Sequence, residues 1–227
     1  MASIYLLRHG KASFGAADYD RLDPLGVRQA ECLGRALAAC RLRDPVFFTG
    51  SLRRHHETLA ACMEGLQASG EVLVDPRWNE FDHERILQAA YPREVEQLRG
   101  AIALDADSRR AFQRLLEGAM ARWVAGAHDA DYTETWSGFA ARVSDALASV
   151  ATALGAGRDA VVSTSGGPIA MAVRQALSLA DAQAVALNWV IANASYTRLI
   201  AASPPRLASF NVHAHLEQAG PEWLTYR

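Results

Sequence analysis

Cysteine is scarce in this sequence: only Cys32, Cys40 and Cys62 occur in 227 residues. An odd number of cysteines without paired spacing argues against a disulfide framework, and the spacing does not fit a metal site. All three cysteines lie in segments with a helical pattern. We therefore expect reduced thiols packed inside the protein, as in a cytoplasmic compartment.

An excess of charge of one sign is also missing. The formal net charge is −2 and the isoelectric point is about 6.4. Such a chain has no general positive field to attract nucleic acid or an acidic membrane surface. We therefore expect neither as a partner, and any anion site must be a local cluster of arginines.

Long apolar runs are absent as well. None reaches the roughly 20 residues that span a bilayer, and the first residues lack the pattern of a secretory signal. These absences favour a cytoplasmic protein. There are no repeats or low-complexity tracts, and a hydrophobic content of 50% in 227 residues is enough for one large domain.

Short apolar runs alternate with helical patterns along the chain. The predicted strands are 3–8, 45–49, 71–75, 159–164, 195–201 and 206–211. The principal helical patterns between them are 26–41, 52–66, 136–155 and 168–178. Continuous apolar strands are typical of sheets buried on both faces. The alternation predicts an α/β fold, a three-layer α/β/α sandwich with a mostly parallel sheet.

Residues 84–130 interrupt this alternation. They contain helical patterns at 92–102 and 107–126 and no clear strand. We interpret this stretch as a helical cap inserted into a single domain of residues 1–227, covering the carboxyl edge of the sheet. No group of His, Asp and Cys has the spacing of metal ligands, so we expect neither a metal nor another cofactor.

The most informative motif, Arg8-His9-Gly10, follows the first predicted strand. Ligands of α/β proteins bind outside the carboxyl ends of strands. Arg8 is a permanent cation whose planar fork fits phosphate, and His9 can act as a nucleophile or carry a proton near neutral pH. Gly10 lets the backbone approach a ligand closely. The three residues together point to phosphate chemistry on a histidine.

Four further segments accompany this motif, at 22–30, 49–58, 77–80 and 160–168. As a set they resemble the histidine phosphatase superfamily, the phosphoglycerate mutase-like proteins. The resemblance covers most of the chain and leaves the stretch around 84–130 unmatched. It implies a histidine acid phosphatase-type phosphomonoesterase in which His9 is transiently phosphorylated.

The same resemblance assigns roles to three more residues. Arg8 and Arg54, the latter in Ser51-Leu52-Arg53-Arg54, would hold the phosphoryl oxygens. Glu80, in Trp78-Asn79-Glu80, would protonate the leaving oxygen and later activate water. A carboxyl group in a partly closed pocket can have the raised pKa that this task needs.

The sequence departs from the family at Ser165, where members carry a second histidine. A serine hydroxyl can donate a hydrogen bond to a phosphoryl oxygen but cannot supply the positive charge of a protonated histidine. Losing one charged donor costs roughly 2–4 kcal/mol of transition-state stabilisation. Gly166, at a predicted helix start, still offers a backbone N–H to an anion. His55 or His56 could compensate, but adjacent helical residues point about 100° apart, so at most one faces the site.

Three alternatives to the phosphatase remain open. A phosphoglycerate mutase-type phosphotransferase would need its phosphoenzyme shielded from water, and because the chain ends soon after its last predicted strand, we favour hydrolysis. A weakly active member that binds a phospho-ligand or a protein would follow from Ser165. A serine hydrolase acting through Ser165 would leave Arg8 and Arg54 without a purpose.

The expected partner is a small phosphorylated substrate or a phosphoprotein. The apolar stretch 185–191 fits either the core or the face of a homodimer.

Overall fold

The computed structural model describes residues 1–13, 20–98, 106–155 and 157–226. These residues form two compact units, Met1–Glu80 with Val143–Arg227, and Phe81–Arg142. The first unit contains the sheet, and the second is helical in its described residues. The stretch 84–130 lies within the second unit. Its predicted role as a cap over the sheet stays a prediction.

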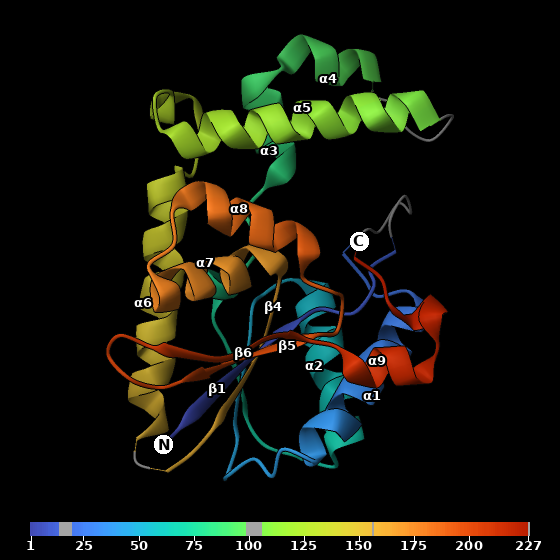
Figure 1. Cartoon of the computed structure of the whole chain (residues 1–227), viewed down its shortest axis with the longest axis vertical. Helices are drawn as coiled ribbons and strands as arrows, with labels where there is room; N and C mark the ends of the chain where they lie inside the picture. The colour runs from blue at the N-terminus through green and yellow to red at the C-terminus, as the bar shows by residue number, and fades with distance from the viewer. Residues whose placement is uncertain (14–19, 99–105, 156, 227) are drawn as a thin grey trace. The chain divides into compact units, whose positions relative to one another are not determined.

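The first unit is built on a six-stranded sheet in the order β3-β2-β4-β1-β5-β6 (Figure 1). The strands are β1 (Ser3–Arg8), β2 (Val46–Thr49), β3 (Val72–Val74), β4 (Ala160–Thr164), β5 (Tyr196–Ile200) and β6 (Arg206–Val212). The four strands β3, β2, β4 and β1 run parallel, whereas β5 pairs antiparallel with β1 and β6 pairs antiparallel with β5. The mostly parallel α/β sheet predicted from the sequence is confirmed.

Helices lie on both faces of this sheet (Figure 1). One face carries α1 (Pro24–Ala38), α2 (Arg53–Leu66) and α9 (Ala214–Ala219). The other side carries α7 (Gly166–Leu177), α8 (Asp181–Val190) and the first-unit part of α6 (Trp136–Leu154). Tyr5 and Leu7 alternate along β1 and join Leu33 of α1, Leu59 of α2 and Leu216 of α9 in one buried cluster. Period-two alternation on the strand therefore selects which residues meet these helices.

The predicted strand at 71–75 forms, but it is not buried on both faces. Among the strands that the structure describes, β3 pairs only with β2, and Val72, Leu73 and Val74 are 36%, 38% and 52% exposed. An edge strand has one neighbour, so part of its surface stays open to solvent. The apolar run here reflects β-propensity more than burial.

The second unit contains α3 (His83–Ala90), α4 (Pro92–Leu98) and α5 (Ala106–Ala125). The helical patterns at 92–102 and 107–126 correspond to α4 and α5; the last residues of the first pattern, 99–102, lie outside the described residues. Helix α3 was not predicted from the sequence; the Asp82 carboxylate caps its first turn by accepting a hydrogen bond from Arg85 N–H.

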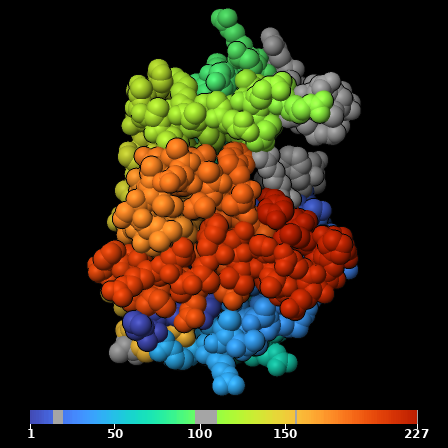
Figure 2. Space-filling model, viewed as in Figure 1, coloured from blue at the N-terminus to red at the C-terminus, as the bar shows by residue number. Residues whose placement is uncertain are grey.

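The end of the chain folds onto the first unit. Figure 2 shows the C-terminal segment, coloured red, spread over one face of that unit. The Gln29 side chain of α1 donates to the Trp223 carbonyl at 2.7 Å and to Thr225 Oγ1 at 2.9 Å. These bonds fix the segment after α9 beside the start of α1.

Within the described residues, no helix is long and apolar enough to cross a bilayer.

Candidate active site

Three neighbouring parallel strands end at one edge of the sheet. In the register of the sheet, Arg8 of β1 lies opposite Thr164 of β4, and Thr49 of β2 lies opposite Ser163. The next residues along the chain are therefore neighbours in space. They are His9, Gly50 and Ser165, and this edge is where an open α/β sheet binds its ligands.

His9 is held firmly by its own backbone. Its N–H donates to the Thr164 carbonyl at 2.9 Å, and its carbonyl accepts from Asn193 Nδ2 and Ala194 N–H, both at 3.2 Å. Ring nitrogen Nδ1 lies 2.8 Å from the Gly10 carbonyl. Because a carbonyl only accepts, Nδ1 carries the hydrogen, and the lone pair of the neutral ring is on Nε2. His9 thus offers a nucleophilic Nε2 in a fixed direction.

The surroundings keep His9 neutral. Burial lowers its pKa well below the usual 6.5, and the charges of Arg54 and Arg8 lower it further, followed by His55. A group that must attack phosphorus needs its lone pair, so this shift favours the reactive form at neutral pH. The same two arginines that disfavour a proton on His9 would attract a phosphoryl group.

Arg54 lies in the first turn of α2 and is only 9% exposed. Its Nη1 donates to Asp20 Oδ1 at 2.6 Å, while the other Asp20 oxygen accepts from Arg53 N–H at 2.8 Å. The sequence analysis missed Asp20, which belongs to no motif it used. Arg8 is anchored at the end of β1 by a hydrogen bond from Nη1 to the Ile191 carbonyl.

The structure shows a steric need for glycine at position 10 that does not involve a ligand. A Cβ at Gly10 would lie 2.3 Å from the carbonyl oxygen of Gly26, so the glycine is needed where two backbones cross. Its N–H donates to Thr58 Oγ1 at 3.0 Å. The Thr58 hydroxyl in turn donates to the Arg54 carbonyl at 2.7 Å, which ties the Arg-His-Gly turn to α2.

The turn after β4 joins Ser165 to two other candidates. Ser165 occupies the position before α7 where a serine usually caps the helix, but its side chain makes no capping bond. Instead, Glu80 Oε2 accepts from Gly167 N–H at 3.1 Å, and Ser165 Oγ lies 2.7 Å from His55 Nε2. The structure therefore brings Glu80 and His55 to this turn, with Gly166 as the first residue of α7.

The two candidate compensating histidines differ in position. His55 is fully buried, and its ring centroid lies 5.9 Å from that of His9. His56 is exposed. Consecutive residues of a helix face different directions, as the sequence predicted, and only His55 faces the site. Among the residues that the structure describes, no group of three His, Cys, Asp or Glu side chains is placed to hold a metal ion.

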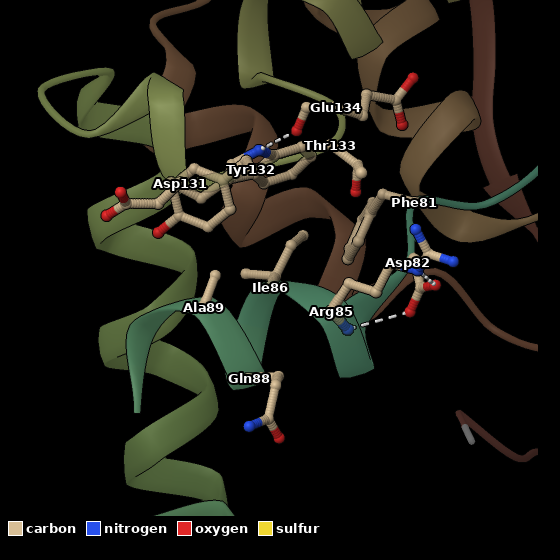
Figure 3. A pocket seen from close by; sticks show the side chains of 11 residues that line it. Phe81, Asp82, Arg85, Ile86, Gln88, Ala89, Asp131, Tyr132, Thr133 and Glu134 are labelled. Atoms are coloured by element: carbon tan, nitrogen blue, oxygen red, sulfur yellow. Dashed lines mark hydrogen bonds and ion pairs between the residues drawn. The ribbon is translucent and has the colours of Figure 1, made fainter. Parts of the chain in front are cut away.

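A separate pocket of about 300 Å³ lies within the second unit (Figure 3). Phe81, Ile86 and Trp123 supply its apolar lining. Its three acidic residues are paired, Asp82 with Arg85 at 3.2 Å, Asp131 with Arg122 at 2.5 Å and Glu134 with Arg142 at 2.7 Å. Phe81, the first lining residue in the sequence, directly follows Glu80. The lining is largely apolar, and its charges are compensated.

Comparison with known proteins agrees with this arrangement. A family model described as histidine phosphatase superfamily (branch 1) matches residues 4–211. A comparison with the curated proteins finds no match.

Solved structures show the same fold at low sequence identity. A phosphoserine phosphatase mutant from Entamoeba histolytica matches with a TM-score of 0.65 and 16% identity, over 95% of this chain and 100% of that one. A phosphoglycerate mutase from Bacillus anthracis gives 0.64 and 17%, over 94% of each chain. A mycobacterial glucosyl-3-phosphoglycerate phosphatase gives 0.62 and 23%, over 94% of this chain and 100% of that one.

Proposed function

The chain belongs to the histidine phosphatase superfamily, and from this membership we propose that it hydrolyses phosphomonoesters through a phosphohistidine on His9. The observation that carries the proposal is the bond from His9 Nδ1–H to the Gly10 carbonyl at 2.8 Å. That bond leaves the lone pair on Nε2, in the field of Arg8 and Arg54. A neutral, oriented imidazole beside two cations suits attack on a phosphate ester.

In the first step, His9 Nε2 attacks phosphorus and the bond from phosphorus to the ester oxygen breaks. The guanidinium groups of Arg8 and Arg54 stabilise the charge on the non-bridging oxygens. Protonated Glu80 gives its proton to the departing oxygen, which leaves as an alcohol. The bond to Gly167 N–H holds the Glu80 carboxyl group at the turn after β4.

In the second step, water attacks the phosphohistidine. The Glu80 carboxylate takes a proton from that water, the bond between Nε2 and phosphorus breaks, and inorganic phosphate leaves. Nε2 recovers its lone pair, and Nδ1 keeps its hydrogen throughout. The cycle needs neither a metal nor another cofactor, because the two arginines carry the charge stabilisation.

The proposed substrate is a small phosphorylated molecule or a phosphoprotein. Structures with this fold include enzymes named for phosphoserine and for glucosyl-3-phosphoglycerate. Both are small phosphomonoesters, which supports this class of substrate.

Turnover of p-nitrophenyl phosphate without added metal tests the function. We expect the wild type to hydrolyse the ester and His9→Ala to lose at least about 1,000-fold in kcat, because the covalent route is removed. The matched control is His56→Ala, which removes an exposed histidine from α2. Denaturing the enzyme during turnover with a phosphorus-labelled substrate should trap an acid-labile phosphohistidine in the wild type and in His56→Ala, but not in His9→Ala.

The results separate the competing functions. Equal rates for wild type and His9→Ala would contradict the phosphatase and leave a protein that binds phosphate ligands. Transfer of the label to an added alcohol in preference to water would identify a phosphotransferase of the mutase type.

A further inference from the structure

His55 is the buried group of this site to which the two steps above give no task. Its side chain has no exposed surface, and Nε2 lies 2.7 Å from Ser165 Oγ. In the described part of the chain, Nδ1 makes no hydrogen bond. Burial lowers the pKa of the ring well below 6.5, with Arg54 and His56 adding to the shift, so the ring is neutral. A buried, half-satisfied imidazole is expensive, which calls for a reason.

Gly50 provides the space that this ring occupies. A Cβ at Gly50 would lie 3.0 Å from His55 Cε1 and only 2.3 Å from its Nδ1, a distance that real Cβ atoms essentially never show. Gly50 follows β2 at the same edge of the sheet as His9 and Ser165. Glycine at 50, histidine at 55 and serine at 165 therefore form one fitted set.

The hydrogen of the pair belongs to His55. If Ser165 donated to His55, Nδ1 would carry a buried N–H without an acceptor. With the hydrogen on Nε2, the atom left without a partner is a lone pair on Nδ1, and buried N–H groups without an acceptor are rarer than buried acceptors without a donor. His55 Nε2–H therefore donates to Ser165 Oγ. The serine hydrogen then points to another acceptor, and Glu80 already serves the start of α7 in place of the usual serine cap.

We propose that His55 is a positioning residue that acts through Ser165, holding the serine hydroxyl so that it donates to a non-bridging oxygen of the bound phosphoryl group. The inference rests on the proposed function, because it assigns a donor in the same phosphate site. An isolated serine hydroxyl rotates among several directions; one fixed by a buried ring is preorganised for the charge that develops during transfer. The pair thereby supplies a donor where Ser165 alone would be a loose one.

Two measurements on the same variants test this role. One is binding of orthovanadate, which resembles the pentacoordinate transition state, followed by calorimetry. The other is kcat and KM for p-nitrophenyl phosphate. The variants are His55→Ala, Ser165→Ala, the double variant His55→Ala/Ser165→Ala, and His55→Gln. His56→Ala, one residue along α2 and exposed, is the matched control.

We expect Ser165→Ala to lower kcat about 100-fold and His55→Ala about 10-fold or more, with smaller changes in KM, because both remove stabilisation of developing charge. In the Ser165→Ala background, His55→Ala should change kcat less than about threefold, since its only route of action is gone. Gln has an amide N–H close to the position of Nε2, so His55→Gln should stay within about threefold of the wild type. Orthovanadate affinity should follow the same order.

Independent losses would overturn the proposal. If His55→Ala costs the same factor with and without Ser165, the ring supports the fold or acts elsewhere. The same conclusion follows if His55→Gln, with an unchanged melting temperature, loses as much as His55→Ala. If the variants show the expected order of orthovanadate affinity but the wild type hydrolyses no ester, the phosphatase is contradicted and the positioning role stands.

Discussion

At the scale of single residues, two histidines about 6 Å apart differ because each has a different ring nitrogen tied to the protein. His9 binds the Gly10 carbonyl through Nδ1, which leaves Nε2 for attack. In His55 it is Nε2 that is tied to the protein, through Ser165, and the lone pair is left on the buried Nδ1. Hydrogen-bond partners, more than residue type, thus divide the roles.

Gly50→Ala tests the space around His55 without changing the histidine. The added Cβ must displace the ring, whose Nδ1 would be 2.3 Å away. We expect kcat for p-nitrophenyl phosphate to fall about as far as in His55→Ala, roughly tenfold, through loss of an oriented donor.

In a His55→Ala background, the same Gly50→Ala change should have a smaller effect, because the ring is gone and only the contact of the new Cβ with Asn79 Oδ1, at 2.7 Å, remains. Gly70→Ala is the control, because its Cβ would meet only Phe47 at an ordinary 3.4 Å. A Gly50→Ala enzyme with full activity would show that the ring need not stay where it is.

Asp20→Asn tests competition for Arg54. The Asp20 carboxylate lies 2.6 Å from Arg54 Nη1, in the place of an anion. A partly exposed ion pair of this kind is worth about 0.2–1 kcal/mol, so removing the charge should tighten orthovanadate binding up to about fivefold by calorimetry. Glu57→Gln, which removes the charge paired with Arg53, is the control. Weaker binding in Asp20→Asn would mean that the carboxylate orients the arginine for its ligand.

The sequence predicted the parts of the site that are written in contiguous motifs. Arg8 and His9 follow a strand, and Arg54 and Glu80 follow recognisable segments, so their convergence at one sheet edge could be anticipated. From the sequence, His55 and His56 were equal candidates, because tertiary packing decides which face of a helix points to the site. The sequence analysis missed Asp20, whose contact with Arg54 spans 34 positions of the chain.

At the scale of elements, the continuous apolar runs identified all six strands, since few other structures bury such runs. The helices α3, α8 and α9 were not predicted. α8 buries only Ala184 among its residues, so its sequence shows no clear apolar stripe. The prediction that β3 is buried on both faces was wrong, because β-propensity does not reveal which strand lies at the edge of a sheet.

The contact between α1 and α2 gives a prediction for Gly34→Ala. Alanine normally stabilises a helix interior by about 1 kcal/mol relative to glycine. Here a Cβ would lie 2.1 Å from the Cys62 carbonyl oxygen, a backbone atom that cannot move aside alone. The sign should reverse, with a loss of about 1–3 kcal/mol in the free energy of unfolding from overpacking, measured by urea denaturation.

Gly138→Ala in the first turn of α6 is the contrast to Gly34→Ala. Its Cβ would meet only the Thr135 side chain at 3.1 Å, and we expect a change of less than about 1 kcal/mol. Equal effects at the two glycines would mean that the helices separate easily, and the close contact would then contribute little to stability.

At the scale of the whole molecule, a nearly neutral chain concentrates positive charge around two buried histidines. The net charge of −2 gives no sign of this. Arg54 lowers the pKa of both His9 and His55, after burial as the main cause, and Arg8 adds to the effect on His9. The proposed phosphate site is therefore positively charged before any substrate binds, and the fold must keep both rings unprotonated.

This arrangement predicts that stability falls on mild acidification. Below pH 6.5, the unfolded chain protonates these histidines while the folded chain does not, so protons favour the unfolded state. Each histidine contributes up to about 1.4 kcal/mol per pH unit between its lowered folded pKa and 6.5. Urea denaturation at pH 7.0, 6.0 and 5.5 should show the free energy of unfolding decreasing in that order.

Variants locate the source of the slope. His9→Gln and His55→Gln each remove one titrating group and should each flatten the dependence between pH 5.5 and 6.5. The pKa of His215 is also lowered, mainly by burial, and its slope should survive in both variants. Asp159 has a lowered pKa despite its burial because Arg43 donates hydrogen bonds to it; it titrates below this window. A wild type whose stability is constant from pH 7.0 to 5.5 would mean that the rings accept protons in the folded state, and the neutral nucleophile at His9 would have to be abandoned.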